Sequence, residues 1–305
     1  MWFLFPRIPL GQWADSFISW IQSVFGWLLD GISVVLQETY EFLFLILSFP
    51  GILVEKEMIA DSSVMKALLT ILMILLFAAL AWLAASWKVA VYTVIGFYVI
   101  YALGQWENAM ATLSMVVVAV VIALIIAIPV GIWAAKSPVV SMIVKPVLDL
   151  MQAMPALAYL VPAIVMFSVG IVPGAIATII FSLPPGVRLT ELGIRQVDRE
   201  TVEAGQAFGA SPGHILRKIQ LPLAMPTIMA GINQVIMLAL SMVVLAGMAG
   251  SGGLGGEVVG AISRLNVGVG IESGLAVVLL AVYLDRVTGG LGNKTPLERA
   301  KRASA

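Results

Sequence analysis

The chain has 305 residues, of which 61% are hydrophobic and only 11% are charged, and its formal net charge is zero. Such an apolar composition excludes an ordinary soluble domain. The zero net charge gives nucleic-acid binding no electrostatic support, and the lack of cysteine excludes disulfide scaffolds and thiolate chemistry. Several apolar stretches reach the length of about 20 residues that crosses a bilayer. The sequence therefore predicts an all-α, polytopic membrane protein.

The N-terminal region contains an amphipathic pattern. Residues 1–7 lack a basic start and a continuous apolar core, so no cleavable signal peptide is expected. Over residues 13–38, small or polar side chains recur every three or four positions: Asp15, Ser19, Gln22, Gly26, Asp30, Ser33 and Gln37. This helical period suits a helix in the membrane interface or one packed on the outer edge of a bundle. Residues 40–54 are apolar but short and interrupted by Pro50 and Gly51, which favours an interfacial or re-entrant segment over a span.

The rest of the chain contains about seven predicted membrane-crossing helices. They lie near residues 64–86, 89–104, 109–134, 147–169, 172–187, 226–248 and 271–288. A composition shift falls near residue 105, and all eight tryptophans lie at or before residue 133. We expect a peripheral part over residues 1–105, a core over 106–290 and a tail over 291–305.

The distribution of Lys and Arg among the loops predicts the orientation of the chain. If the polar segment 188–226 is placed inside, every Lys and Arg falls on the cytoplasmic side except Arg7, Lys56, Lys66 and Arg264. The opposite orientation would invert this bias. We therefore expect the N-terminus outside and the C-terminus in the cytoplasm.

The polar segment 188–226 carries helix signals of its own. Asp198 can cap a first short helix, which Gly209 can end in a left-handed conformation. A Ser-Pro pair at 211–212 can then open a second helix, and a Leu-Pro pair at 221–222 is expected to end it. Two short helices joined by a tight turn would form a compact cytoplasmic knob.

A run within this segment resembles the EAA loop of ABC importer permeases. It reads Glu203-Ala204-Gly205-Gln206-Ala207-Phe208-Gly209, then nine residues, then Ile219-Gln220-Leu221-Pro222. Gly205 departs from the family's Glu-Ala-Ala pattern and weakens a helix by about 1 kcal/mol. The resemblance implies that the loop docks into a groove on the ATP-hydrolysing subunit. It assigns this coupling role to Glu203, Ala204, Gly205, Gly209, Ile219, Leu221 and Pro222.

The resemblance extends over residues 105–290 to the glycine betaine/proline betaine permeases. It is carried by runs such as Met151-Gln152-Ala153-Met154-Pro155-Ala156, Leu183-Pro184-Pro185-Gly186-Val187-Arg188 and Gly252-Gly253-Leu254-Gly255. It implies a type I ABC permease core that imports quaternary-ammonium osmoprotectants across the bacterial cytoplasmic membrane. The implied partners are a second copy of the chain, a soluble substrate-binding protein and an ABC ATPase that holds ATP and Mg. We expect no catalytic residue, metal or cofactor on this chain.

A path for a cationic solute should carry no fixed positive charge. The predicted spans 109–134, 147–169 and 226–248 contain no Lys or Arg, and Asp149 is their only ionisable residue. Polar groups and soft methionines within these spans are candidates for the lining and gate: Met151, Gln152, Met154, Pro155, Tyr159, Asn233, Gln234 and Ser241. The alternative is that the polar side chains hold helices together.

Two other functions fit part of the pattern. One is an ABC permease for another small solute, such as an amino acid or choline. The other is an ion-coupled secondary carrier, although such carriers commonly have ionisable residues at the bilayer midplane and inverted repeats, and neither is found in this sequence. No nucleotide-binding Gly-x-x-x-x-Gly-Lys-[Ser/Thr] motif occurs, so ATP hydrolysis is expected on another chain.

Overall fold

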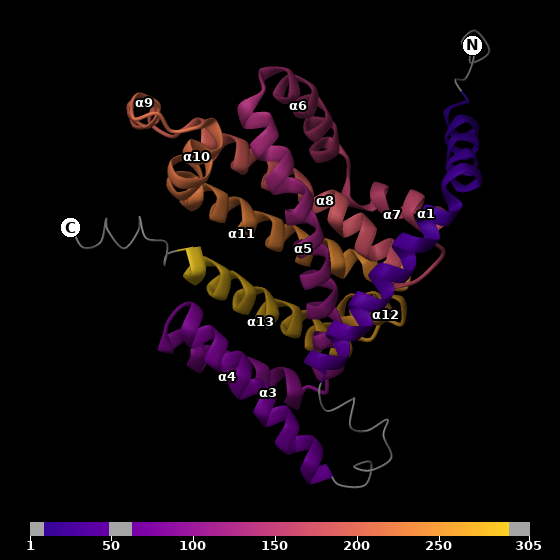
Figure 1. The fold of residues 1–305 in the computed structure, drawn as a ribbon. Helices are drawn as coiled ribbons and strands as arrows, with labels where there is room; N and C mark the ends of the chain where they lie inside the picture. The colour runs from indigo at the N-terminus through magenta and orange to yellow at the C-terminus, as the bar shows by residue number, and fades with distance from the viewer. Residues whose placement is uncertain (1–8, 49–62, 293–305) are drawn as a thin grey trace, which may run out of the picture.

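A computed structural model of the protein describes residues 9–48 and 63–292, and these residues form helices and short connections without a strand. The expectations for residues 1–7, for the interruption at Pro50 and Gly51 and for the tail beyond residue 292 lie outside the described residues. Figure 1 shows the helices. They are α1 (Leu10–Leu47), α3 (Ser63–Ala84), α4 (Trp87–Ala102), α5 (Trp106–Lys136), α6 (Pro138–Ala153), η1 (Ala156–Tyr159), α7 (Leu160–Phe167), α8 (Ile171–Arg195), α9 (Arg199–Ala207), α10 (Pro212–Ile215), η2 (Leu216–Gln220), α11 (Leu221–Ala246), η3 (Gly247–Ala249), α12 (Gly253–Ser263) and α13 (Val267–Gly292).

The centre of the fold is α8, which packs between α5 and α11. Most of its residues are buried, including Pro184 and Pro185 within the helix. A proline inside a helix removes one backbone hydrogen bond, and here the neighbouring helices α5 and α11 pack against α8 on both sides. The buried residues of α8 include Gly174, Gly186 and Gly193, and small residues of this kind allow helices in a membrane to pack closely.

Contacts between helix ends show the relative directions of α5, α8 and α11. At one end, the Gly170 N–H donates to the Ala249 carbonyl oxygen at 2.9 Å, and the Leu254 N–H donates to Thr112 Oγ1 at 2.8 Å. At the other end, Arg195 donates to the carbonyl oxygen of Ala134 at 2.9 Å. Helices α5 and α8 therefore run in the same direction, and α11 runs opposite to both. Between α5 and α8, the bent pair of α6 and η1–α7 returns the chain to the end at which α8 begins.

The described helices agree with most of the predicted spans. Six are long and apolar enough to cross a membrane, and the number rises to seven if a bent pair of helices counts as one span. At 16 residues, α4 is the shorter apolar helix, and with α3 it forms a peripheral hairpin. The ring of Phe97 in this hairpin lies 5.0 Å from the ring of Tyr283 in α13.

One predicted span, residues 147–169, is wrong as a single straight helix. The segment instead contains α6, a break, and the pair η1–α7, and the two parts meet at a bend of 110°. The residue before a proline avoids the α conformation, and Met154, which precedes Pro155, is extended at φ −74° and ψ 135°. Pro155 is therefore the physical cause of the break.

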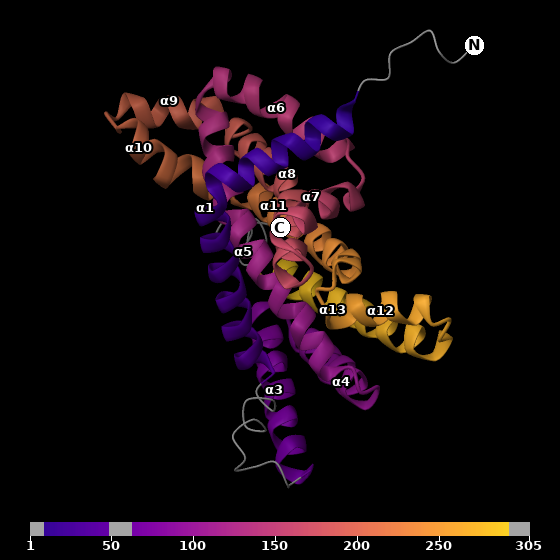
Figure 2. The same cartoon turned by 90° about the vertical axis from the view of Figure 1, so that its right-hand side faces the viewer.

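The expected boundary within the N-terminal region is also wrong. The helix predicted over residues 13–38 continues without interruption to Leu47, so residues 40–47 are part of α1 rather than a separate re-entrant segment. No proline lies between Pro9 and Leu47 to end the helix. Figure 2 shows α1 along the outside of the bundle, changing direction part-way. Its length and apolarity make it a further candidate span.

Candidate functional site

The first helix of the polar loop forms as its capping residues predict. Helix α9 begins after Asp198, whose carboxylate accepts a hydrogen bond from the Glu200 N–H at 3.0 Å. It ends at Gly209, which has the predicted left-handed backbone at φ 76°. The Ala210 N–H then donates to the Gly205 carbonyl oxygen at 3.1 Å. The predicted start and end of this helix are confirmed.

The second helix starts where expected but does not end there. Ser211 accepts a hydrogen bond from the His214 N–H at 3.4 Å, which starts α10. The Leu-Pro pair at 221–222 was expected to end this helix, and that expectation is wrong: α10 continues through the π-helical turn η2 into α11. Pro222 lies in the first turn of α11 and has no N–H to pair, so the change to π spacing falls where one bond is absent anyway. Loop and span are therefore one continuous rod.

The two short helices of the loop pack against each other through one small residue. A Cβ atom added to Gly205 would lie 2.7 Å from Cδ1 of Ile219 and 3.6 Å from Cγ1 of Ile215. Ile215 is buried. Leu221 is half-buried and Pro222 is exposed. Gly205, where the sequence departs from the EAA pattern, and Ile219, where it matches, therefore face each other across the knob.

The outer surface of the knob carries exposed side chains. Glu203 and Ala204 are exposed, and Phe208 is 91% exposed. Glu203 and Gln206 line a small polar pocket of about 260 Å³ together with Arg195. Exposed aromatic and charged side chains on a short rigid element are suited to binding another protein.

The break between α6 and α7 brings together some of the predicted path residues. The Tyr159 hydroxyl donates a hydrogen bond to the Met151 carbonyl oxygen across the bend. The Tyr159 ring lies 6.1 Å from the ring of Phe181 in α8, edge to face. Met151 is half-buried, whereas Gln152 and Pro155 are exposed. The bend is therefore held by a side chain four residues beyond the proline.

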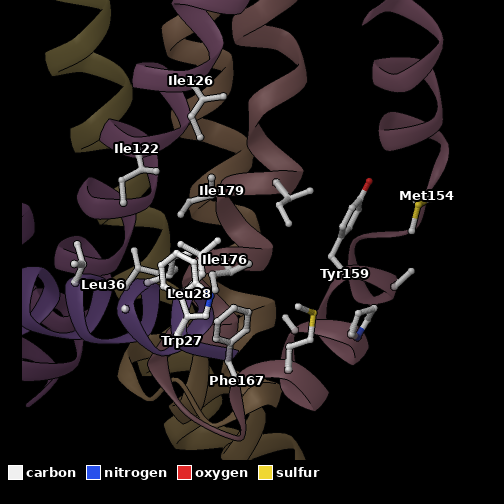
Figure 3. Close-up of a pocket in the computed structure, with 18 residues that line it drawn as sticks. Trp27, Leu28, Leu36, Ile122, Ile126, Met154, Tyr159, Phe167, Ile176 and Ile179 are labelled. Atoms are coloured by element: carbon white, nitrogen blue, oxygen red, sulfur yellow. The ribbon is translucent and has the colours of Figure 1, made fainter. Parts of the chain in front are cut away.

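An apolar cavity of about 840 Å³ lies beside this bend. Figure 3 shows Tyr159 and Met154 on one side of it and Ile122 of α5 across from them. Trp27 and other residues of α1 complete the wall. Of the predicted path residues, Met154 and Tyr159 line this cavity.

The predicted path residues of α11 have different surroundings. The Asn233 amide donates to Asp285 of α13 at 3.1 Å and accepts from the Thr288 hydroxyl at 2.9 Å. Ser241 donates to a carbonyl oxygen of its own helix at 3.0 Å, and Gln234 is exposed. Asn233 therefore connects two helices, which is the alternative that the sequence left open for it. In the described part of the chain, none of these three residues lines the apolar cavity.

Sequence reasoning missed a buried carboxylate at the loop end of α8. Glu191 is 4% exposed and pairs with Arg195 at 2.9 Å and Lys145 at 3.5 Å. Residues 188–195 were expected in a polar loop, where a carboxylate would be solvated, but they form the last turns of α8. The spacing of Glu191 and Arg195, four residues apart, was the available signal.

Comparison with known proteins identifies the family. A family model described as "Binding-protein-dependent transport system inner membrane component" matches residues 127–291. The chain belongs to this family. It is 45% identical to the glycine betaine transport system permease protein OpuAB of Bacillus subtilis, over 93% of this chain and 94% of that protein. It is 42% identical to the glycine betaine/proline betaine permease ProW of Escherichia coli, over 93% of this chain and 75% of that protein.

A solved structure supports the same fold. The MetNI methionine ABC transporter, in inward-facing conformations, matches with a TM-score of 0.54 and 22% identity over 66% of this chain and 96% of that one. The expectations of an ABC permease core and a multi-pass membrane protein are therefore confirmed. Among the described residues, no group of His, Cys, Asp or Glu could hold a metal ion.

Proposed function

We propose that this permease subunit imports glycine betaine, proline betaine or a related quaternary-ammonium osmoprotectant across the bacterial cytoplasmic membrane. The observation that carries the proposal is the identity of 42–45% over 93% of the chain to OpuAB and ProW, which are named for these solutes. The partners we propose are an ABC ATPase that binds ATP and Mg, a soluble substrate-binding protein and a second copy of this chain. The N-terminus would lie outside and the C-terminus in the cytoplasm.

The proposed division of labour within the chain follows the two candidate sites. The knob over residues 198–220, with Glu203, Ala204 and Gly209, engages the ATPase. The bend beside Met154 and Tyr159 contributes to the translocation path, together with Met151, Gln152 and Pro155. Gln234 and Ser241 of α11 are further candidates for the same path. Asn233 instead connects α11 to α13 through its hydrogen bonds to Asp285 and Thr288.

The substrate can be tested by uptake into vesicles that contain the complete complex. ATP-dependent uptake of labelled glycine betaine is measured with the binding protein present, and unlabelled proline betaine, choline, carnitine and amino acids are added as competitors. We expect proline betaine to compete and amino acids without a quaternary ammonium group to fail. Choline is the main rival, because a choline permease of Bacillus subtilis is 30% identical over 63% of this chain. Accumulation by this chain alone, without ATP, would instead identify an ion-coupled carrier.

The coupling role of the knob can be tested at Gly209. This residue has φ 76°, and a Cβ added to it would meet nothing within 4 Å, so only the backbone conformation opposes a side chain. Gly209→Val should strain the turn by about 1–2 kcal/mol and displace α10 relative to α9. We expect less ATPase subunit in the purified complex and lower solute-stimulated ATP turnover.

The matched variant is Gly209→Asn, since asparagine tolerates the left-handed region. It should retain both the ATPase subunit and the stimulated turnover. Full subunit retention and full turnover in Gly209→Val would show that the knob is not the coupling element.

A further inference from the structure

A cluster of charged side chains joins α6 to α8 at the end of the bundle that carries the knob. Its centre is Glu191, whose side chain is 5% exposed. The carboxylate accepts a hydrogen bond from Ser141 at 2.7 Å, and it pairs with Lys145 at 3.5 Å and with Arg195 at 2.9 Å. Two helices and both signs of charge thus converge on one buried group.

A second ion pair continues the cluster along the same helix faces. Arg188 of α8 pairs with Asp149 of α6. On α6, the members Ser141, Lys145 and Asp149 recur every four residues, so they share one face. This face meets the face of α8 that carries Glu191, and acidic and basic groups alternate along the seam.

The cluster contributes much of the contact between these helices. The buried residues of α6 are Ser141, which belongs to the cluster, and Leu148. Leu148 packs in a small apolar cluster with Ala127 and Val187. Separating α6 from α8 would break both the hydrogen bond from Ser141 and the ion pair with Lys145 at the Glu191 carboxylate. Hydrogen bonds to a charged group are stronger than those between neutral groups, so the cluster favours the packed arrangement of the two helices.

The position of the cluster connects the two candidate sites. Arg195, its last member, also donates to the Ala134 carbonyl oxygen of α5, and Asp198, the cap of the first knob helix, follows three residues later. In the other direction, α6 leads from Asp149 to the bend at Met154 and Pro155. The knob and the broken helix are therefore linked by one block that contains α6 and α8.

We propose that this charged cluster is the positioning element that makes α6 move with α8, so that displacement of the knob by the ATPase reaches the broken helix. The proposal rests on the coupling function proposed above. Glu191, Lys145, Asp149, Arg188 and Arg195 do not touch the solute in this mechanism. They determine how many solute molecules cross for each ATP hydrolysed.

The first test exchanges the charges of the exposed pair. Asp149→Arg alone would leave Glu191 as the one anion among four cations of the cluster, and Arg188→Asp alone would place three anions beside two cations. Each should lower the ratio of solute taken up to ATP hydrolysed by at least about fivefold, and the double exchange should restore it to within about twofold of the parent. Lys88→Gln, an exposed cation in α4, is the control and should leave the ratio unchanged. Glu191→Gln, which keeps the shape of the side chain, should lower the ratio as the single exchanges do.

The second test replaces the ion pair by a covalent link. Because the natural chain has no cysteine, Asp149→Cys with Arg188→Cys introduces the sole thiols of this subunit. With its thiols reduced, the double cysteine variant should take up less solute for each ATP hydrolysed than the parent. A short bifunctional thiol reagent should restore this ratio if α6 and α8 move as one block. Loss of transport on cross-linking would show that α6 must separate from α8 and would overturn the proposal.

Retention of the ATPase subunit separates this proposal from the coupling proposal. It is measured in every variant by co-purification. Normal retention with a low uptake ratio in the single exchanges supports the cluster as a transmission element. A double exchange that stays uncoupled, single exchanges that keep the parent ratio, or release of the ATPase by the single exchanges would each contradict it. Full turnover in Gly209→Val would contradict the coupling function of the knob instead.

Discussion

Glycines on the helix faces determine how closely α5 and α11 approach α8. A Cβ atom on Gly131 of α5 would lie 2.7 Å from the carbonyl oxygen of Val187, and one on Gly231 of α11 would lie 2.9 Å from Cβ of Leu189. The first contact is with backbone and the second is with the base of a side chain, so neither neighbour can yield easily. These positions require glycine for packing and not for a special backbone conformation.

Gly205 is a different case, because its neighbour can move. We predict that Gly205→Ala, which restores the Glu-Ala-Ala pattern, is tolerated. The closest atom to the new methyl group is the end of the flexible Ile219 side chain, and replacing glycine in a helix stabilises it by about 0.5–1 kcal/mol. The variant complex should keep all of its ATPase subunit on purification, with unchanged stimulated turnover. Gly205→Val, whose branched side chain would also press on Ile215, is the contrasting variant, and loss of the ATPase from the alanine variant would refute this account of the contact.

At the scale of elements, two interruptions of helical structure have opposite consequences. Pro155 stops α6 and turns the chain by 110°, which produces a bend beside the apolar cavity. Pro222, by contrast, lies after a π turn, and the helix continues from α10 into α11. The polar loop therefore has two different connections: a short turn that ends at the cap Asp198 joins it to α8, and an uninterrupted helix joins it to α11.

The hydrogen bonds of Asn233, which connect α11 to α13, are expected to stabilise the fold. Asn233→Leu should destabilise the protein by about 1–3 kcal/mol, because Asp285 and Thr288 would lose the amide that they contact. Each kcal/mol corresponds to a decrease of about 2 °C in the melting temperature, because the shift becomes smaller as the chain becomes longer. The melting temperature is measured in detergent by the fluorescence of the tryptophans. Gln234→Leu, at a neighbouring exposed position, is the control and should leave the melting temperature within about 1 °C. Equal melting temperatures for the two variants would show that these hydrogen bonds do not stabilise the fold.

For the whole molecule, one chain carries a single knob. If each knob engages one ATPase subunit, a complex with two ATPase subunits needs two permease chains. We predict that native mass spectrometry of the purified complex will show two copies of this chain and two of the ATPase. A complex with one copy of this chain and a different permease would disprove the homodimer.

Local signals in the sequence were sufficient for the elements that depend on a few neighbouring residues. The caps at Asp198 and Ser211 and the left-handed Gly209 follow from hydrogen bonds and backbone sterics within one turn of helix. The membrane-crossing helices follow from apolar length, because a bilayer requires every backbone polar group to be paired within the segment. The family resemblance added the role expected for the loop, which these local signals alone could not supply.

The tertiary structure decided everything that depends on which helix faces meet. The sequence contains Pro155, but the angle of the break at this residue depends on the packing of α7 against α8. It contains Glu191, but the burial of this carboxylate depends on α8 extending to Arg195 and on α6 lying across it. Asn233 similarly became a tie between helices because α13 places Asp285 and Thr288 opposite it. Burial and pairing are properties of contacts between residues far apart in the chain, so no pattern within a single segment could specify them.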